Sequence, residues 1–386
     1  MLRRLKVQNY KSLESVDVKL RPLSVFVGPN NAGKSNIFDC LQFVADLVTQ
    51  GAGAVHGRGG FGTLVWGGDL KRTISIGLEG VLTLGSGDRI PYIYELSLAG
   101  GPLHHSIIKE ALSVKRDHMT QKVLEFPSPE QPGVARVWDE EGLPLPIVGY
   151  QDFYPLLTNV FQGHFFPGHS LLAALAKTIG SWRSYHFVPA RMRQPLPVKK
   201  DLQLQSDGGN LPTVLLSLQA EHRDLFRQIV EILRSGVPEL RELYAAFTGE
   251  GAAYISIEEQ GFSQRIPAWA MSDGTLQLLA HLAVLYSPSP PALVCFEEPE
   301  NFLHPHLLQL VADLFREASK RTQILVSTHS PYLLNFIDPD DLFIVEKSEG
   351  KTKVKPAHKK QGLKEALRVL GLGEMWYAGS LGGVPQ

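Results

Sequence analysis

Eight residues near the start of the chain match a phosphate-binding loop. Residues 28–35 read Gly-Pro-Asn-Asn-Ala-Gly-Lys-Ser, which fits the pattern G-x-x-x-x-G-K-S/T. The glycines let backbone N–H groups point into one concavity, and the N-terminus of the next helix adds its positive dipole end there. Lys34 can reach the β- and γ-phosphates of a nucleotide, and the Ser35 hydroxyl can bind Mg²⁺. The pattern predicts a nucleotide phosphate site formed by Gly28, Asn30, Asn31, Ala32, Gly33, Lys34, Ser35 and Asn36.

Two adjacent glutamates follow an apolar stretch late in the chain. Residues 291–296 read Pro-Ala-Leu-Val-Cys-Phe, and Glu297 and Glu298 come directly after them. Glu297 stands where a Walker B carboxylate holds Mg²⁺, and Glu298 can orient or deprotonate an attacking water. Adjacent carboxylates with different tasks suit phosphoryl transfer, which depends on positioning and on charge stabilisation. The apolar strand before this pair and Pro299 after it argue against an ordinary solvated turn.

Two further segments carry groups that can contact the same nucleotide. His329 follows an apolar strand, and its neutral imidazole can hydrogen-bond a γ-phosphate or the attacking water. Residues 271–275 read Met-Ser-Asp-Gly-Thr and open a predicted helix, of which Ser272 is the natural N-cap. The N–H groups of that helix start, with Ser272 and Gly274, can form a second anion site. The alternative for Ser272 is an ordinary structural cap.

The elements that must position these groups are short apolar strands. Residues 23–27 form the strand before the phosphate-binding loop, and residues 323–327 form the strand before His329. Ligands of open α/β sheets bind at the carboxyl ends of the strands, where loops far apart along the chain meet. Glu297 lies 263 residues after Lys34 (297 − 34 = 263), and we expect both to reach one nucleotide.

The middle of the chain shows other patterns. Residues 73–139 alternate apolar and polar side chains between Gly and Pro turns, which predicts an antiparallel β-subdomain. Residues 150–182 look helical, residues 213–235 are expected to form one helix, and strands are expected within 240–268.

The glycine-rich segment 51–68 is interpreted as a flexible surface connection. The alternative is a mobile loop near the nucleotide, in which Arg58 reaches a phosphate.

The composition is that of a globular protein of 386 residues, with 44% hydrophobic and 20% charged residues. The net charge of −1 predicts no overall attraction to nucleic acid or anionic membranes. Cys40 and Cys295 lie in apolar segments, so we interpret them as buried thiols in a reducing compartment. No signal peptide and no run of 18 apolar residues is present, which predicts a cytoplasmic protein with no membrane partner.

The motifs together, in this order, resemble a known family. They are residues 28–35, Ser272-Asp273-Gly274, the segment 297–305 that reads Glu-Glu-Pro-Glu-Asn-Phe-Leu-His-Pro, and Ser327-Thr328-His329-Ser330. This set is similar to the ABC-type ATPases of the RecF/SMC branch, and residues 7–13 are similar to the opening of that branch. The nearest resemblance is to compact AAA-type ATPases related to the ATPase half of overcoming-lysogenization-defect (OLD) nucleases.

The resemblance implies ATP and Mg²⁺ as cofactors and a role for each matching residue. Lys34 and Ser35 then bind phosphate and Mg²⁺, and Glu297 replaces the usual Walker B aspartate as a metal ligand. Glu298 is implied to be the catalytic base and His329 the switch histidine.

The resemblance also implies a head-to-tail dimer that encloses ATP between two subunits. In it, Ser272 and Gly274 contact the nucleotide of the partner subunit, although the signature here is Ser-Asp-Gly and not Ser-Gly-Gly. The glutamine of the Q-loop is not placed, with Gln151 and Gln194 as weak candidates.

The predicted fold class is α/β, a P-loop NTPase of the ABC-ATPase-head type with an antiparallel β-subdomain and a helical insertion. Four segments are expected. They are the P-loop half of the core (1–50), the glycine-rich loop with the β-subdomain (51–150), the helical or mixed insertion (151–270), and the signature, Walker B and switch half (271–386).

The expected function is an ATP-driven switch that dimerises around ATP and gates a DNA repair or anti-phage defence activity. About 40 residues follow the last core strand, too few for a Toprim-like nuclease, so a nuclease or other effector is expected on a separate chain. One alternative is a RecF-like ATPase that binds DNA directly, and a less favoured one is a transporter ATPase subunit. The candidate DNA-binding residues are Arg191, Arg193, Lys199, Lys200, Lys351, Lys353, Lys355, Lys359 and Lys360.

Overall fold

The chain divides into two compact units in the computed structural model. The structure describes residues 1–102, 104–116, 119–128, 133–139, 141–145, 148–149, 152–163, 170–359, 363–366 and 370–382. The first unit comprises Met1–Arg183, Asp340–Gln361 and Leu381–Gln386, and the second comprises Ser184–Pro339 and Gly362–Ser380. The four-segment division expected from the sequence stays a prediction.

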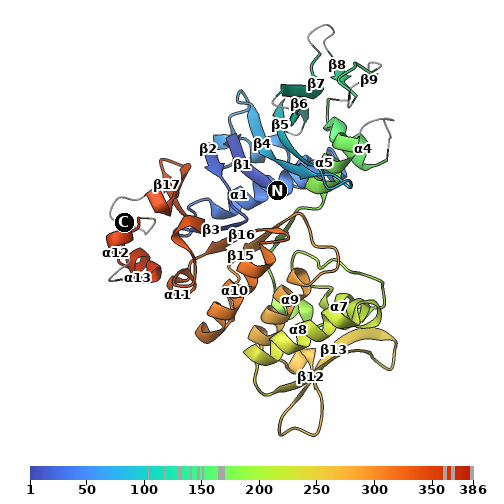
Figure 1. Cartoon of the computed structure of the whole chain (residues 1–386), viewed down its shortest axis with the longest axis vertical. Coiled ribbons are helices and arrows are strands. Elements are labelled where there is room, and N and C mark those ends of the chain that lie inside the picture. Colours follow the sequence, from blue (N-terminus) through green and yellow to red (C-terminus); the bar gives the residue numbers. More distant parts are fainter. Residues whose placement is uncertain are drawn as a thin grey trace. The chain divides into compact units, whose positions relative to one another are not determined.

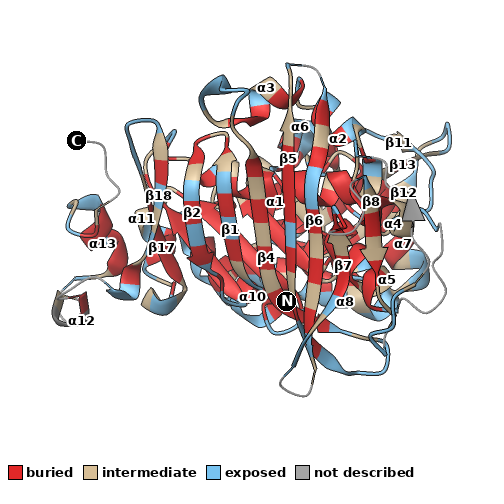
Figure 2. Ribbon diagram, turned by 90° about the horizontal axis from the view of Figure 1, so that it is seen from above, coloured by how far each residue is buried: buried red, intermediate tan, exposed pale blue. Residues whose placement is uncertain are grey.

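An antiparallel sheet forms much of the first unit, and Figure 2 shows its strands side by side. Buried side chains alternate with half-buried or exposed ones along much of Ile74–Thr83 and Arg89–Gly100, as the period-two pattern of residues 73–139 predicts. In spatial order the strands are β2 (Leu13–Lys19), β1 (Leu2–Tyr10), β4 (Ile74–Thr83), β5 (Arg89–Gly100), β6 (His105–Arg116), β7 (Met119–Phe126), β8 (Val134–Val137) and β9 (Val148–Gly149).

The phosphate-binding loop of the first unit lies between a buried strand and a long helix. All five residues of β3 (Leu23–Val27) are buried, and α1 (Lys34–Gln50) begins inside the motif. Strand β17 (Leu342–Ser348) runs parallel to β3 and forms a hairpin with β18 (Lys351–Pro356). Helices α4 (Leu156–Phe161) and α5 (Ser170–Gly180) pack against α1, where Thr158 donates a hydrogen bond to Leu47 O at 2.8 Å.

The interpretation of residues 51–68 as a flexible surface connection is wrong. The segment contains α2 (Gly53–His56), α3 (Phe61–Leu64) and the 3₁₀ turn η1 (Trp66–Gly68), and it buries the side chains of Val55, Phe61 and Leu64.

The alternative for this segment, in which Arg58 reaches a phosphate, is also not what the structure shows. The guanidinium of Arg58 pairs with two carboxylates of α1, Asp39 at 3.0 Å and Asp46 at 2.8 Å. Burial disfavours ionisation of Asp39, but hydrogen bonds from Lys11 and Tyr10 and the charge of Arg58 outweigh it, so the Asp39 pKa is lowered. Arg58 therefore ties this segment to the P-loop helix.

The second unit contains two parallel strands with an aromatic core beside them. Strands β15 (Leu293–Glu297) and β16 (Gln323–Thr328) pair with Glu297 opposite Ser327. Helices α9 (Asp273–Leu285) and α10 (Leu308–Ala318) contribute to the core, in which Phe296 and Phe315 stack at 5.1 Å between ring centres. The ends of β15 and β16 carry the predicted catalytic segments.

A smaller helix and strand group completes the second unit (Figure 1). The prediction of one helix over 213–235 is wrong, because His222 leaves the helical region (φ −131°, ψ 55°) and separates α7 from α8. The group consists of α7 (Leu211–Glu221), α8 (Arg223–Gly236), β11 (Leu196–Pro197), β12 (Leu240–Phe247), β13 (Ala252–Glu259) and β14 (Ile266–Pro267).

The other described elements are short, and none of them is longer than six residues. They are β10 (Arg183–Tyr185), α6 (Pro189–Met192), η2 (Ala268–Ala270), η3 (Pro305–Leu307), α11 (Pro331–Leu334), η4 (Pro339–Asp341), η5 (Ala357–Lys359), α12 (Leu363–Ala366) and α13 (Leu372–Tyr377). Within the described part of the chain, no helix has the length and apolar character needed to cross a membrane.

Candidate functional site

Two glycines of the phosphate-binding loop have no room for a side chain. Gly33 has φ +103°, and a Cβ there would collide with the hydroxyl oxygen of Thr352. A Cβ on Gly28 would collide with the backbone carbonyl of Val345. The loop is therefore pressed closely against the β17–β18 hairpin, and its backbone keeps the open curvature that a phosphate requires.

Lys34 is the first residue of α1 and is buried. Its ammonium group donates hydrogen bonds to Gly28 O at 2.8 Å and Pro29 O at 3.1 Å, so the side chain folds back over the loop. A buried cation that contacts two backbone carbonyls of the loop, at a helix N-terminus, fits the phosphates of a nucleotide. The next residue, Ser35, supplies the hydroxyl expected to bind Mg²⁺.

A chain of hydrogen bonds connects the loop to Ser12, near the start of the chain, and to Thr352 in β18. The Asn36 amide donates to Ser12 Oγ at 2.7 Å, and Ser12 Oγ lies 2.7 Å from Thr352 Oγ1. Thr352 Oγ1 in turn donates to Ala32 O at 2.9 Å. The side chain of Asn36, expected to contact nucleotide, thus also braces the loop. Sequence reasoning missed Ser12 and Thr352, because no local spacing links residues 340 positions apart.

The second unit brings Glu298 and His329 together. Glu298 has a left-handed backbone (φ 47°), and its N–H donates to Ser327 O at 2.9 Å, across the two parallel strands. His329 Nε2 lies 3.3 Å from Glu298 Oε1, and Asn301 Nδ2 donates to Glu298 Oε2 at 2.9 Å. Glu297 is the last residue of β15 and lies directly before this pair. The geometry suits a carboxylate and an imidazole that share one water.

Glu300 is a further residue of this segment that sequence reasoning missed. Its Oε1 accepts hydrogen bonds from Thr328 Oγ1 at 2.6 Å and from the His329 N–H at 2.9 Å. Burial raises the pKa of the carboxyl. A glutamate two residues after the Glu297-Glu298 pair gives no signal by itself, since its partners lie 28 and 29 positions away.

Ser272 is the N-cap of α9, as predicted. Its Oγ accepts the Thr275 N–H at 3.1 Å, and a Cβ on Gly274 would come within 2.7 Å of Phe302 O. The side chain of Asp273 forms an ion pair with Arg193. Arg193 also donates to Met271 O at 2.7 Å, so the aspartate that departs from the usual signature helps to hold the turn before α9.

The residues predicted to bind phosphate belong to the first unit. Ser272, Gly274, Glu297, Glu298 and His329 belong to the second. Their convergence on one nucleotide stays a prediction. Of the two weak Q-loop candidates, Gln151 lies outside the described residues and Gln194 is exposed in the second unit.

A family model described as "AAA domain, putative AbiEii toxin, Type IV TA system" matches residues 135–335, just over half of the 386-residue chain. The chain belongs to this AAA domain family. A second model, described as an AAA ATPase domain, matches residues 1–50 of the same chain. The two matches include residues 28–35, the predicted phosphate-binding loop, and the predicted Walker B and switch segments.

The AAA domain chain is also similar to known proteins. It is 48% identical over 44 residues to the OLD nuclease of Thermus scotoductus, and this match spans 11% of the chain and 8% of that relative. An SMC head bound to the C-winged helix domain of ScpA matches with a TM-score of 0.57 and 15% identity, over 95% of this chain and 99% of the other. A Pyrococcus furiosus SMC head domain with an extended coiled coil, bound to the C-terminal domain of ScpA, matches with a TM-score of 0.51, 15% identity and the same coverage.

These similarities confirm the predicted fold class. The AAA domain chain has an SMC-head-like α/β fold with an antiparallel sheet and helices, which is a P-loop ATPase fold. The expected resemblance to ABC-type ATPases of the RecF/SMC branch, related to OLD nucleases, is likewise confirmed.

Several of the basic residues proposed to bind DNA have acidic partners. Lys200 pairs with Glu221 at 2.8 Å, Lys351 with Glu14 at 2.9 Å and Lys355 with Glu346 at 3.0 Å. Lys360 lies outside the described residues. These pairs reduce the net positive charge that the two segments would offer to a phosphate backbone.

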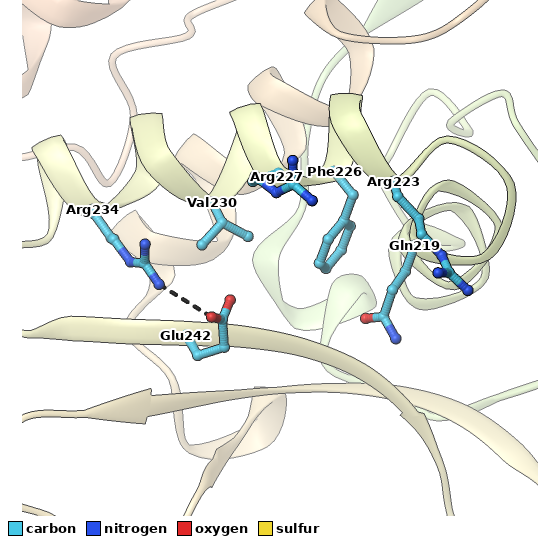
Figure 3. Close-up of a pocket in the computed structure, with 7 residues that line it drawn as sticks. All are labelled: Gln219, Arg223, Phe226, Arg227, Val230, Arg234 and Glu242. Carbon is cyan, nitrogen blue, oxygen red and sulfur yellow. Dashed lines mark hydrogen bonds and ion pairs between the residues drawn. The ribbon is translucent and has the colours of Figure 1, made fainter.

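A cavity of about 370 Å³ lies between α8 and β12 in the second unit (Figure 3). Gln219 bonds both backbone groups of Ala245, at 3.2 and 3.0 Å, and Arg234 bonds Arg241 O and Glu242. Side chains that line the cavity thus occupy backbone groups along β12. A strand whose backbone groups are occupied in this way is a poor template for pairing with another chain. We assign no ligand to the cavity.

Proposed function

We propose that the protein is an Mg²⁺-dependent ATPase that acts as a molecular switch. The observation that carries this proposal is the pairing of Glu298 with His329 at 3.3 Å, in a chain that also has a closely packed phosphate-binding loop. Membership in an AAA domain family supports it. Bound Mg²⁺ would be held by Ser35 and Glu297 and would neutralise charge on the phosphates.

In this proposal each residue of the candidate site has a defined task. Lys34 exchanges its hydrogen bonds to Gly28 O and Pro29 O for bonds to phosphate oxygens. Glu298 orients the attacking water and accepts its proton, and His329 donates a hydrogen bond to the phosphate or the water. Asn301 and His329 engage both oxygens of Glu298 in the structure, so they hold the carboxylate in one orientation.

A more detailed proposal concerns how the subunits assemble around ATP and which activity they control. Two subunits of a cytoplasmic protein clamp two ATP molecules, with Ser272 and Gly274 of each subunit contacting the nucleotide of the other. Hydrolysis then reopens the dimer and gates a DNA repair or anti-phage activity, carried by a separate nuclease or effector chain. The partial match to an OLD nuclease and the SMC-head-like fold support a link to DNA.

Glu298→Gln tests the switch, because it retains the shape of the side chain and removes the base. We expect this variant to bind ATP, to lose at least about 100-fold in hydrolysis, and to accumulate as a dimer or larger oligomer in light scattering. Glu317→Gln, on the exposed side of α10, is the control and should behave as wild type. A Glu298→Gln protein that stays monomeric with ATP bound would contradict the dimer.

A RecF-like ATPase that contacts DNA directly remains the second candidate, on the basis of exposed cations such as Lys353. It requires DNA binding by the purified protein that weakens steeply with salt. Absence of binding at low salt would exclude it, and DNA cleavage by this chain alone with Mg²⁺ would exclude the separate nuclease. Co-purification with a membrane protein would instead favour the transporter subunit.

A further inference from the structure

The loops that follow β15 and β16 are joined by one carboxyl group. The two strands are parallel neighbours, so their C-terminal loops emerge side by side, with Glu297 opposite Ser327. The first loop carries Glu298 and the second carries His329. Between the two loops, the Glu298 N–H donates a backbone hydrogen bond to Ser327 O. The side chain of Glu300 supplies the second connection.

Glu300 binds the turn at three successive residues, directly or through one hydroxyl. Its Oε1 accepts from Thr328 Oγ1 and from the His329 N–H. Thr328 Oγ1 also accepts the Ser330 N–H at 2.9 Å, and Ser330 caps α11 by accepting the Leu333 N–H at 3.2 Å. The path of the chain from the end of β16 into α11 is therefore held by one carboxyl oxygen.

The second oxygen of this carboxyl is in an unusual position. Glu300 Oε2 is buried and has no hydrogen-bond partner among the described residues. A buried polar atom without a partner costs stability, and an apolar residue at position 300 would avoid this cost. The feature that makes a glutamate useful here is thus the acceptor Oε1, together with the reach of its side chain across the two loops.

We propose that Glu300 is a positioning residue for ATP hydrolysis, which holds the Thr328–His329 turn so that the His329 imidazole stays within reach of Glu298. The inference rests on the ATPase function proposed above. Glu300 acts through His329, because its bonded oxygen is already occupied by two donors of the turn. Displacing a reacting group by about 1 Å can cost up to about 100-fold in rate, so a loosened turn should reduce kcat.

The variants are Glu300→Ala, Glu300→Gln and Thr328→Val. Glu300→Ala removes the acceptor and should lower kcat by about tenfold or more, while KM and the affinity for a fluorescent ATP analogue change less than about threefold. Glu300→Gln keeps an acceptor oxygen at the same reach and should stay within about threefold of wild type. Thr328→Val removes the bridging hydroxyl, and its kcat should lie between those of Glu300→Ala and Glu300→Gln.

The matched control is Glu110→Ala in the first unit. Glu110 is also a buried carboxylate, which accepts bonds from Tyr94 OH and the Leu156 N–H, but it belongs to none of the motifs. It should lower the melting temperature as Glu300→Ala does and leave kcat unchanged. Hydrogen exchange of the peptide that contains His329 gives a readout without hydrolysis, and this amide should exchange faster in Glu300→Ala than in wild type.

Two results would overturn the positioning role. One is a Glu300→Ala enzyme with kcat within about threefold of wild type, or with a loss that Glu110→Ala reproduces. The other is unchanged exchange at the His329 amide. If Glu300→Ala does not fold, Thr328→Val and Glu300→Gln decide the question by the same two measurements. Absence of hydrolysis by the wild-type protein contradicts the proposed function itself, while the exchange comparison still tests whether Glu300 holds the turn.

Discussion

His281 is a titratable side chain that the fold of the second unit keeps away from water. It is buried in α9, where Nδ1 lies 2.7 Å from Gln277 O, and Nε2 has no hydrogen-bond partner among the described residues. The rings of Phe187, Phe296 and Phe315 surround it at 5.0 to 5.9 Å between ring centres. Burial lowers the pKa of this histidine to about 4.

This burial makes the stability of the protein dependent on pH. The unfolded chain binds a proton at His281 near pH 6.5, whereas the folded chain resists it until about pH 4. The contribution of the neutral side chain is therefore complete above pH 6.5 and is lost as the pH falls toward 4. At pH 5 the loss amounts to about 2 kcal/mol of the free energy of unfolding.

We expect His281→Leu to reduce this pH dependence. The variant should lose about 2 kcal/mol less than wild type between pH 7.5 and pH 5, in urea unfolding followed by circular dichroism. His358→Leu, in the first unit, is the control and should retain the wild-type slope. Equal slopes in wild type and His281→Leu would show that His281 is not the titrating group.

At the scale of elements, the β17–β18 hairpin supports the phosphate-binding loop. The loop is followed by α1 and preceded by β3, and these neighbours alone would define its ends. Thr352, the second residue of β18, adds a bond to Ala32 O and contacts Ser12, which holds Asn36. The middle of the loop is thereby fixed by an element that lies more than 300 residues later in the chain.

Replacing Thr352 with Val should weaken nucleotide binding. The change keeps the side-chain shape but leaves Ala32 O and Ser12 Oγ short of a partner, at a cost of about 1–3 kcal/mol. If half of this cost is expressed in the loop, the Kd of a fluorescent ATP analogue should rise by about twofold to tenfold. Thr352→Ser keeps the hydroxyl and should restore binding. Equal affinity of Thr352→Val and wild type would mean that the loop keeps its shape without the hairpin.

Some of the elements can be predicted from the sequence, and others cannot. The phosphate-binding loop, the Ser272 cap and the Walker B strand depend on residues adjacent in the chain, so their spacing alone reveals them. The break at His222 is not visible, because apolar residues at helical spacing continue on both sides of it. Segment 51–68 was misjudged because its glycines suggest a loop, although Val55, Phe61 and Leu64 are buried.

Across the whole molecule, the residues that sequence reasoning missed are those with distant partners. Glu300, Ser12 and Thr352 have ordinary local surroundings, and each acquires a role only through a bond to another loop. The residues that we propose to be catalytic stand out in the sequence because the chemistry of phosphate transfer demands their types at the ends of strands. The residues that support them could not be predicted, because many residue types can fill a supporting position and no motif shows which pair is used.

The residues proposed to bind phosphate and those proposed to be catalytic belong to different units. The loop at residues 28–35 belongs to the first unit, while Glu298 and His329 belong to the second. If one ATP is bound by both, nucleotide binding must couple the two units. In hydrogen exchange on Glu298→Gln, ATP with Mg²⁺ should then slow exchange in residues 28–36 and also in residues 297–302 and 327–330.

The segment that contains Ser272 should respond differently, because in the proposed dimer it meets the nucleotide of the partner subunit. Its protection should rise with protein concentration, whereas that of residues 28–36 should depend on ATP concentration alone. Lys34→Ala, which removes a buried cation from the loop, should abolish both effects. Protection confined to the first unit would mean that the motifs do not meet on one nucleotide. Protection of the Ser272 segment that is independent of protein concentration would place all contacts within one subunit, and the switch would then need no dimer.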